Sequence, residues 1–168
     1  MRIHTYNTFV HWDADGGDGT KSYRSYSRNH MIGAQGKPEI AASSDPAFRG
    51  DATRYNPEQL LVASLSSCHM LWYLHLCSLN GITVVDYLDH ASGTMEEDAD
   101  GSAHFTGVEL HPRVTIEGME RRARAVQLHD EAHRLCFIAR SVSFPVKVLP
   151  QILSLPGATF HRRRFDLP

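Results

Sequence analysis

The segment 56–80 constrains the fold most, because it predicts one long helix with apolar residues on almost every side. Asn56 can cap this helix, Pro57 suits its first turn, and Gln59 stands where the partner of a capping box is expected. The helix is expected to end near Asn80. Its apolar residues are Leu60, Leu61, Val62, Leu65, Met70, Leu71, Trp72, Leu74, Leu76 and Leu79. A helix of this kind needs cover on several sides, and a lone domain of 168 residues would struggle to supply it.

The chain before the helix predicts a hairpin followed by a long loop. Residues 2–12 and 20–32 have the character of strands, and the turn-rich stretch DADGGDG at 13–19 lies between them. Residues 33–55 carry several turn signals and no periodicity, so we expect a loop there. Long loops of this kind are often functional.

The chain after the helix predicts a second hairpin, a second helix and a final strand. Residues 82–97 and 103–116 contain β-branched runs on either side of an acidic turn. A helix over about 119–140 and a strand at 144–150 follow, and 151–168 is expected to be a tail, with a solvated end. The sequence therefore predicts one α+β domain.

The charge balance of the chain excludes a general affinity for polyanions. Lys and Arg total 17 against 19 Asp and Glu, so nothing favours nucleic acid, a membrane surface or acidic substrates. The N-terminus has no apolar signal segment, and we expect no stretch that reaches the length needed to span a bilayer. These features predict a cytoplasmic protein.

The three cysteines have different surroundings. An odd count in a chain of this length favours reduced thiols over structural disulfides. Cys77 stands among leucines and is expected to be a buried core residue. Cys68 stands among Ser64, Ser66, Ser67 and His69, which is unusual for a core cysteine. Cys136 lies on the second predicted helix, so it and Cys68 could form a redox pair.

Two motifs carry a resemblance to a known family. The stretch NPEQLLVASLSSCHMLWYLHLC, followed by AHRLCFIARSV, resembles the OsmC/Ohr family of thiol-dependent peroxidases, and the likeness covers about residues 9–148. The resemblance implies that Cys68 attacks the peroxide, that Cys136 resolves it as a disulfide, and that Glu58 is the catalytic glutamate. It also implies an organic hydroperoxide substrate, an external dithiol reductant such as a lipoyl group, no bound cofactor, and an intertwined homodimer with sheets packed around the central helix.

The chemistry of the attacking thiol asks for a nearby cation. A free cysteine has a pKa of about 8.5 and is only slightly ionised at neutral pH, so a guanidinium is expected to stabilise the thiolate. The resemblance implies an arginine before the helix, held by Glu58, but the family's spacing falls on Phe48. We favour its neighbour Arg49 over Arg54, with Arg28 third, and a solvated charge at each position is the alternative.

Helix geometry separates two of the predicted site residues. Ten positions on one helix place Glu58 about 15 Å from Cys68. Either the helix breaks between them, or Glu58 acts in the site of a neighbouring subunit. Apolar side chains such as Met70 and Trp72 would suit an organic hydroperoxide better than hydrogen peroxide.

Two other functions compete with the peroxidase. His129, His133 and Cys136 share one helical face with spacing suited to zinc, although a fourth ligand such as His69 or His75 is needed. The alternative for these histidines is the helix surface or proton handling beside Cys136. A non-catalytic binder of apolar ligands on the same fold is the third possibility.

Overall fold

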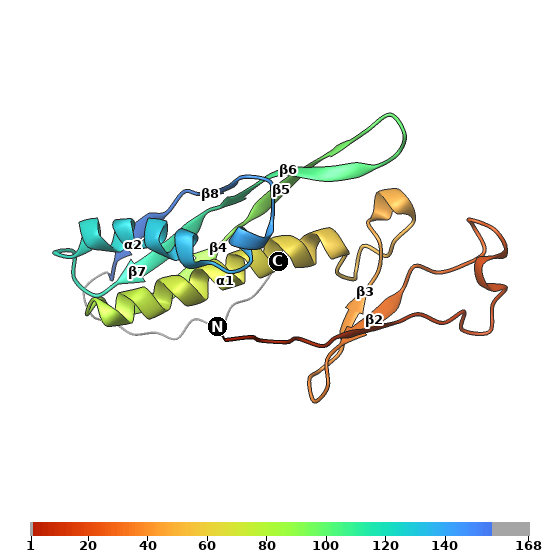
Figure 1. The fold of residues 1–168 in the computed structure, drawn as a ribbon, viewed down its shortest axis with the longest axis horizontal. Coiled ribbons are helices and arrows are strands. Elements are labelled where there is room, and N and C mark those ends of the chain that lie inside the picture. The colour runs from red at the N-terminus through yellow and green to blue at the C-terminus, as the bar shows by residue number, and fades with distance from the viewer. Residues whose placement is uncertain (1, 156–168) are drawn as a thin grey trace. The chain divides into compact units, whose positions relative to one another are not determined.

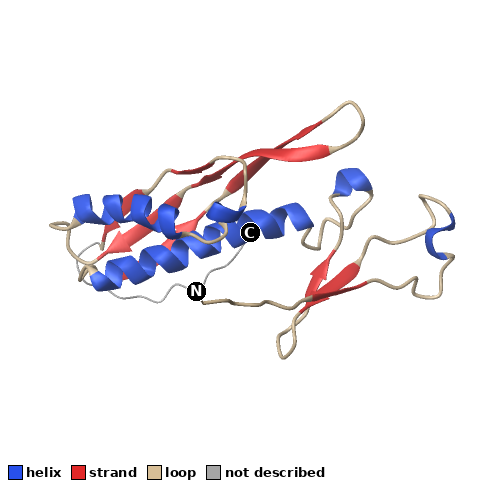
Figure 2. Cartoon of the chain, in the orientation of Figure 1, coloured by secondary structure: helices blue, strands red, loops and turns tan. Residues whose placement is uncertain are grey.

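The structure is a computed structural model that describes residues 2–155, and its fold is α+β (Figures 1 and 2). The chain divides into two compact units, Met1–Leu61 and Val62–Pro168, and the expected single domain stays a prediction. The boundary falls inside the first turns of the long helix α1 (Pro57–Leu79). Each unit is described separately below.

The first unit contains a small antiparallel sheet of β1 (Phe9–His11), β2 (His30–Gly33) and β3 (Ile40–Ala42), in the order β1-β2-β3. The predicted hairpin is confirmed by the pairing of Phe9 with Gly33, but its strands are shorter than expected. Between β1 and β2 the backbone forms turns, which are stabilised by local hydrogen bonds between side chains and backbone, such as those of Asp13 and Ser25. These turns take up residues that were expected to belong to the strands.

The expected loop at 33–55 contains regular structure, which corrects the prediction. Strand β3 pairs with β2, and a short 3₁₀ helix, η2 (Pro46–Phe48), follows it. A second short 3₁₀ helix, η1 (Gly19–Lys21), lies between β1 and β2. Three-residue strands carry too little periodicity to be found from sequence, and β3 exists because the edge of β2 is available to pair with it.

The long helix begins and ends within one residue of its predicted bounds, because its start is specified locally. The Asn56 side chain accepts a hydrogen bond from the Gln59 N–H at 2.7 Å, and the Gln59 side chain accepts one from the Asn56 N–H at 3.1 Å. This is the predicted capping box.

The second unit has two three-stranded sheets, in the orders β4-β7-β9 and β5-β6-β8. Their strands are β4 (Val84–Asp89), β5 (Ser92–Glu97), β6 (Ala103–Leu110), β7 (Pro112–Ile116), β8 (Val146–Val148) and β9 (Gln151–Ser154). The predicted second hairpin is present, since β5 pairs with β6 and β4 with β7. The predicted arms of the hairpin each form two strands, β4 and β5 in the first and β6 and β7 in the second. Between β6 and β7, the His111 N–H donates to the Asp89 side chain, and Pro112 has no N–H to donate to a ladder.

The second helix is shorter than predicted and the last strand lies where a tail was expected. Helix α2 spans Arg122–Leu135, ends at Cys136 in an extended backbone conformation, and is followed by η3 (Ala139–Ser141). Strand β9 pairs in parallel with β7 and buries Ile152, so the expected tail at 151–168 begins in part as a strand. The predicted solvated end at 161–168 lies outside the described residues.

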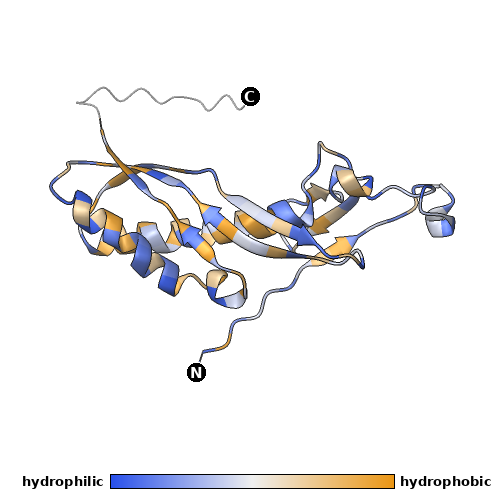
Figure 3. Ribbon diagram, turned by 90° about the horizontal axis from the view of Figure 1, so that it is seen from above, coloured by the Kyte–Doolittle hydropathy of each residue, from blue (hydrophilic) through white to orange (hydrophobic). Residues whose placement is uncertain are grey.

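One stripe of α1 is buried in the second unit, and the rest of the helix is less covered than the sequence predicts. Leu65, His69, Tyr73, Leu76 and Cys77 form the buried stripe at helical spacing. Apolar residues recur along the whole helix (Figure 3), and several remain largely exposed within the chain, namely Leu71 at 60% and Leu79 at 70%.

The long helix also differs from our expectation about membrane spans. Within residues 2–155, α1 is long and apolar enough to cross a bilayer by length and composition alone. One such helix is weak evidence, because the core helix of a soluble protein passes the same test. Of the apolar window in α1, 28% is buried inside the structure.

Candidate functional site

The structure brings the two predicted redox cysteines into contact. Cys68 lies in the middle of α1 and is half-buried, whereas Cys136 ends α2 and is buried. Burial, together with a hydrogen bond to the Cys68 side chain, raises the pKa of Cys136 to about 11. The pair therefore combines one accessible sulfur with one that is shielded from solvent.

The backbone around Cys136 helps to hold its sulfur. The Cys136 N–H still bonds to the carbonyls of α2, but its extended backbone turns the chain away from the helix. The Ala139 N–H consequently donates to Cys136 Sγ at 3.4 Å. A donor of this kind lowers the pKa of the thiol, against the larger effect of burial.

The third cysteine is not part of this pair. Cys77 is buried at 1% exposure in the core of the second unit, two to three turns beyond Cys68 on α1. Burial raises the pKa of its thiol. This agrees with the structural role predicted for it.

The polar residues near Cys68 have partners of their own. Ser66 Oγ donates to Asp89 at 2.6 Å, so this hydroxyl ties α1 to the end of β4. His69 is buried at 1% exposure. Two of the polar residues near Cys68 in the sequence, Ser66 and His69, therefore contact other residues instead of the thiol.

His69 pairs with His129 of α2, which sequence reasoning missed. His69 Nε2 lies 3.0 Å from His129 Nδ1, and the His129 ring stacks on Tyr73 with 3.8 Å between centroids. Burial, with a smaller contribution from nearby His133, lowers the pKa of His69 to about 4. Burial lowers the pKa of His129 to about 3. Both imidazoles are therefore neutral at physiological pH.

The geometry does not support the predicted zinc alternative. His129 turns its Nδ1 to His69, while Cys136 contacts Cys68. Across residues 2–155, no three His, Cys, Asp or Glu side chains are grouped so that they could hold a metal ion. His129 is buried in the interior and His133 is half-buried, so neither lies on the exposed helix surface. A role in proton handling beside Cys136 stays a prediction.

Aromatic side chains lie next to the thiols. Trp72 is one turn beyond Cys68 on α1, and its ring meets that of Phe137 edge-on with 5.4 Å between centroids. Phe137 directly follows Cys136 and is 62% exposed. An apolar, partly accessible surface is thus available beside the half-buried sulfur.

The predicted glutamate and arginines belong to the first unit, so their relation to the thiols stays a prediction. Glu58 is half-buried, and its Oε2 atom is buried without a hydrogen-bond partner. Among the described residues, no ion pair or hydrogen bond joins Glu58 to the candidate arginines. Burying a carboxylate oxygen without a hydrogen-bond donor costs free energy. Glu58 is therefore suited to bind a cationic side chain that this structure does not place beside it.

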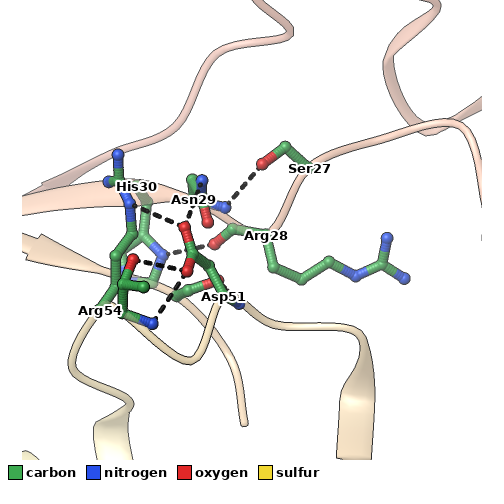
Figure 4. A network of polar contacts seen from close by, with 8 residues as sticks. Ser27, Arg28, Asn29, His30, Asp51 and Arg54 are labelled. Carbon is green, nitrogen blue, oxygen red and sulfur yellow. Dashed lines mark hydrogen bonds and ion pairs between the residues drawn. The ribbon is translucent and has the colours of Figure 1, made fainter. Parts of the chain in front are cut away.

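The three arginines have different neighbours. Arg28 stacks on the Tyr26 ring at 3.8 Å and donates to the Tyr26 carbonyl. Arg54 Nε lies 3.6 Å from Asp51, in the polar network that Figure 4 shows around this carboxylate. Arg49 is exposed and has a left-handed backbone, with φ of 66°, at the end of η2. Within residues 2–155, Arg49 has no ion pair of the kind that engages Arg54.

The continuity of α1 decides one of the two alternatives for Glu58. The helix is unbroken over Pro57–Leu79, so a break that brings Glu58 back to Cys68 is excluded. The remaining alternative, a glutamate that acts in the site of a second subunit, stays a prediction.

Comparisons with known proteins agree with the fold. A family model described as OsmC-like protein matches residues 50–149. A solved OsmC-like protein of unknown function from Vibrio cholerae is 29% identical, with a TM-score of 0.76 over 90% of this chain and 100% of that one. No curated protein sequence matches the chain.

Two more distant structures share the fold. An organic hydroperoxide resistance protein from Legionella pneumophila is 20% identical, with a TM-score of 0.65 over 90% of this chain and 98% of that one. The organic hydroperoxide resistance protein OhrB of Bacillus subtilis is also 20% identical, with a TM-score of 0.61 over 89% of this chain and 98% of that one.

Proposed function

Because this chain belongs to the OsmC-like protein family, we propose that it is a thiol-dependent peroxidase that reduces organic hydroperoxides. The observation that carries the proposal is the contact between half-buried Cys68 and buried Cys136, which come from different helices. Two neighbours of the same fold are named as organic hydroperoxide resistance proteins, which supports this choice of substrate.

The first step takes place at Cys68. Its thiolate attacks one oxygen of the hydroperoxide, so that an S–O bond forms and the O–O bond breaks. The alkoxide that leaves takes a proton and departs as an alcohol, and Cys68 becomes a sulfenic acid. The partly exposed Trp72 and Phe137 beside the thiols offer an apolar surface for the organic group.

The second step uses Cys136. Its sulfur attacks that of the Cys68 sulfenic acid, an S–S bond forms, and the S–O bond breaks. The leaving hydroxyl takes the proton of Cys136 and departs as water. An external dithiol of the lipoyl type then reduces the disulfide in two thiol–disulfide exchanges and returns both thiols.

We assign stabilisation of the Cys68 thiolate to Arg49, with Arg54 and Arg28 as the other candidates. In this assignment Glu58 holds the guanidinium, and both residues come from the partner in a homodimer. The buried, unpartnered Oε2 of Glu58 and the largely exposed apolar residues of α1 support such an arrangement. The protein is then a cytoplasmic homodimer that needs no bound cofactor.

The test compares the wild-type protein with Cys68→Ser in the reduction of tert-butyl hydroperoxide by a dihydrolipoyl reductant. We expect turnover in the wild type and none in the variant, with circular dichroism unchanged. Cys77→Ser is the matched control and is expected to keep its turnover, because Cys77 is buried in the core of the second unit, two to three turns beyond Cys68 on α1. Wild-type protein that consumes no hydroperoxide would instead favour the non-catalytic binder of apolar ligands.

A further inference from the structure

A buried hydrogen bond joins the two helices that carry the thiols. His69 follows Cys68 directly on α1, and His129 lies two turns before Cys136 on α2. The two imidazoles, which we call the imidazole bridge, are each 1% exposed and meet at 3.0 Å. Their rings are nearly parallel, with an angle of 11° between the planes.

Among the described residues 2–155, no other polar group competes with the bridge, because the remaining ring nitrogens, His69 Nδ1 and His129 Nε2, are buried without a hydrogen-bond partner there. The stacked ring of Tyr73 fixes the plane of His129 from one side. The N–H···N bond across the bridge is thus the hydrogen bond that each imidazole side chain makes, and breaking it would leave two buried polar rings unsatisfied.

The bridge also determines where the neighbouring sulfur points. Successive residues of an α-helix are turned by about 100° around its axis, so the direction of His69 fixes that of Cys68. Two further contacts depend on the same orientation of α1. Cys68 contacts Cys136, and one turn later Trp72 contacts Phe137, the residue after Cys136. A rotation of α1 that breaks the bridge would move the Cys68 sulfur away from Cys136.

We propose that His69 and His129 are positioning residues, whose hydrogen bond holds α1 and α2 in the orientation that lets Cys68 and Cys136 close into a disulfide. The role within a peroxidase cycle rests on the proposed function, but the effect on closure does not. Disulfide formation needs the two sulfurs to approach to about 2 Å with a defined torsion angle, so it is sensitive to small rotations of either helix.

The hydrogen bond between His69 and His129 requires that both rings are neutral. A hydrogen bond between two imidazoles needs one protonated nitrogen and one free nitrogen at the contact. Burial lowers the pKa of both rings, and the charge of His133 opposes protonation of His69, while Asp89 favours it. The bond is therefore intact at the pH where the thiols react.

The test measures closure with diamide, which accepts two electrons and two protons from the thiols and becomes a hydrazine. This oxidant acts without peroxidase activity. In His129→Leu, we expect formation of the Cys68–Cys136 disulfide to slow at least about tenfold. The rate at which Cys68 reacts with iodoacetamide is measured in parallel, and the closure rate is divided by it, so that a change in the exposure of Cys68 is separated from a change in its approach to Cys136.

Two variants accompany this measurement. His129→Asn places an amide where Nδ1 lies and is expected to restore most of the closure rate. His104→Leu makes the same change at an exposed histidine of β6 and should leave the rate unchanged. Closure in folded His129→Leu at the wild-type rate, or equal slowing in His104→Leu, would overturn the proposal.

A second measurement needs no variant. In ¹⁵N-histidine-labelled wild-type protein, a scalar coupling between His69 Nε2 and His129 Nδ1 is expected in both the reduced and the disulfide form. Loss of this coupling in the disulfide form would show that closure does not use the bridge and would refute the inference. If the wild type consumes no hydroperoxide, but diamide still closes its disulfide faster than that of His129→Leu, the proposed function alone is refuted.

Discussion

The imidazole bridge predicts that acid destabilises the folded protein well above the pH at which carboxylates are protonated. Burial lowers the pKa of His69 to about 4 and that of His129 to about 3, whereas both are about 6.5 in the unfolded chain. Below pH 6.5 the unfolded state therefore binds more protons than the native state. The free energy of unfolding falls as the pH falls, and the fall levels off below the native pKa values.

The magnitude follows from these values. Between pH 7 and pH 5 each unfolded imidazole becomes almost fully protonated while each native one stays neutral, which costs about 2 kcal/mol per histidine. The bridge as a whole should then cost about 4 kcal/mol, a large part of the roughly 5–15 kcal/mol that stabilises a typical domain.

Urea unfolding at pH 7, 6 and 5 measures this effect, at one fixed protein concentration. The comparison is a double variant, His69→Gln with His129→Asn, which has amides in place of both titrating rings. We expect the stability of the wild type to fall about 4 kcal/mol more than that of the double variant over this range. Parallel pH dependence in the two proteins would refute the reasoning, because it would mean that the buried histidines do not titrate on unfolding.

Four other outcomes follow from the structure. In Cys136→Ser, peroxide should drive Cys68 to the sulfinic acid within a few turnovers, which mass spectrometry detects; a stable sulfenic acid with full turnover would assign the resolving role elsewhere. Leu65→Ala, at a fully buried position of α1, should lower the free energy of unfolding by about 3 kcal/mol, and a loss below about 1 kcal/mol would place Leu65 outside the core. Protein purified without added zinc should contain no stoichiometric metal by elemental analysis, and a bound equivalent would restore the site at His129 and His133. Sedimentation at micromolar concentration should find a dimer, and a stable monomer would contradict the shared site.

The sequence predicted best what depends on local interactions. The bounds of α1 were predicted within one residue because Asn56 and Gln59 form a capping box that neighbouring residues alone specify. Strand β3 was missed because it has three residues and depends on the free edge of β2, and β9 was missed because it pairs with β7, a strand far away in the sequence. Three or four residues have too short a pattern to predict such pairing.

The site was predicted only in part for the same reason. Neighbouring residues distinguished Cys68 from Cys77, and the position of Cys136 on a second predicted helix suggested a redox pair with Cys68. The attacking and resolving roles came from the family resemblance. The imidazole bridge joins residues 60 positions apart, and the local pattern around His129 and His133 suggested a zinc site rather than a hydrogen bond to His69. One signal was available, since His69 and Tyr73 lie one turn apart on the stripe that α1 buries.

The central claim is that Cys68 and Cys136 form one redox pair, and a titration of free thiols tests it most directly. Each chain has three cysteines, and one disulfide consumes two, so one equivalent of an organic hydroperoxide should lower the free thiols from three to one per chain. Peptide mapping should then find Cys68 joined to Cys136 and Cys77 free. Three remaining thiols with the hydroperoxide unconsumed, or a disulfide between Cys68 and Cys77, would contradict the account.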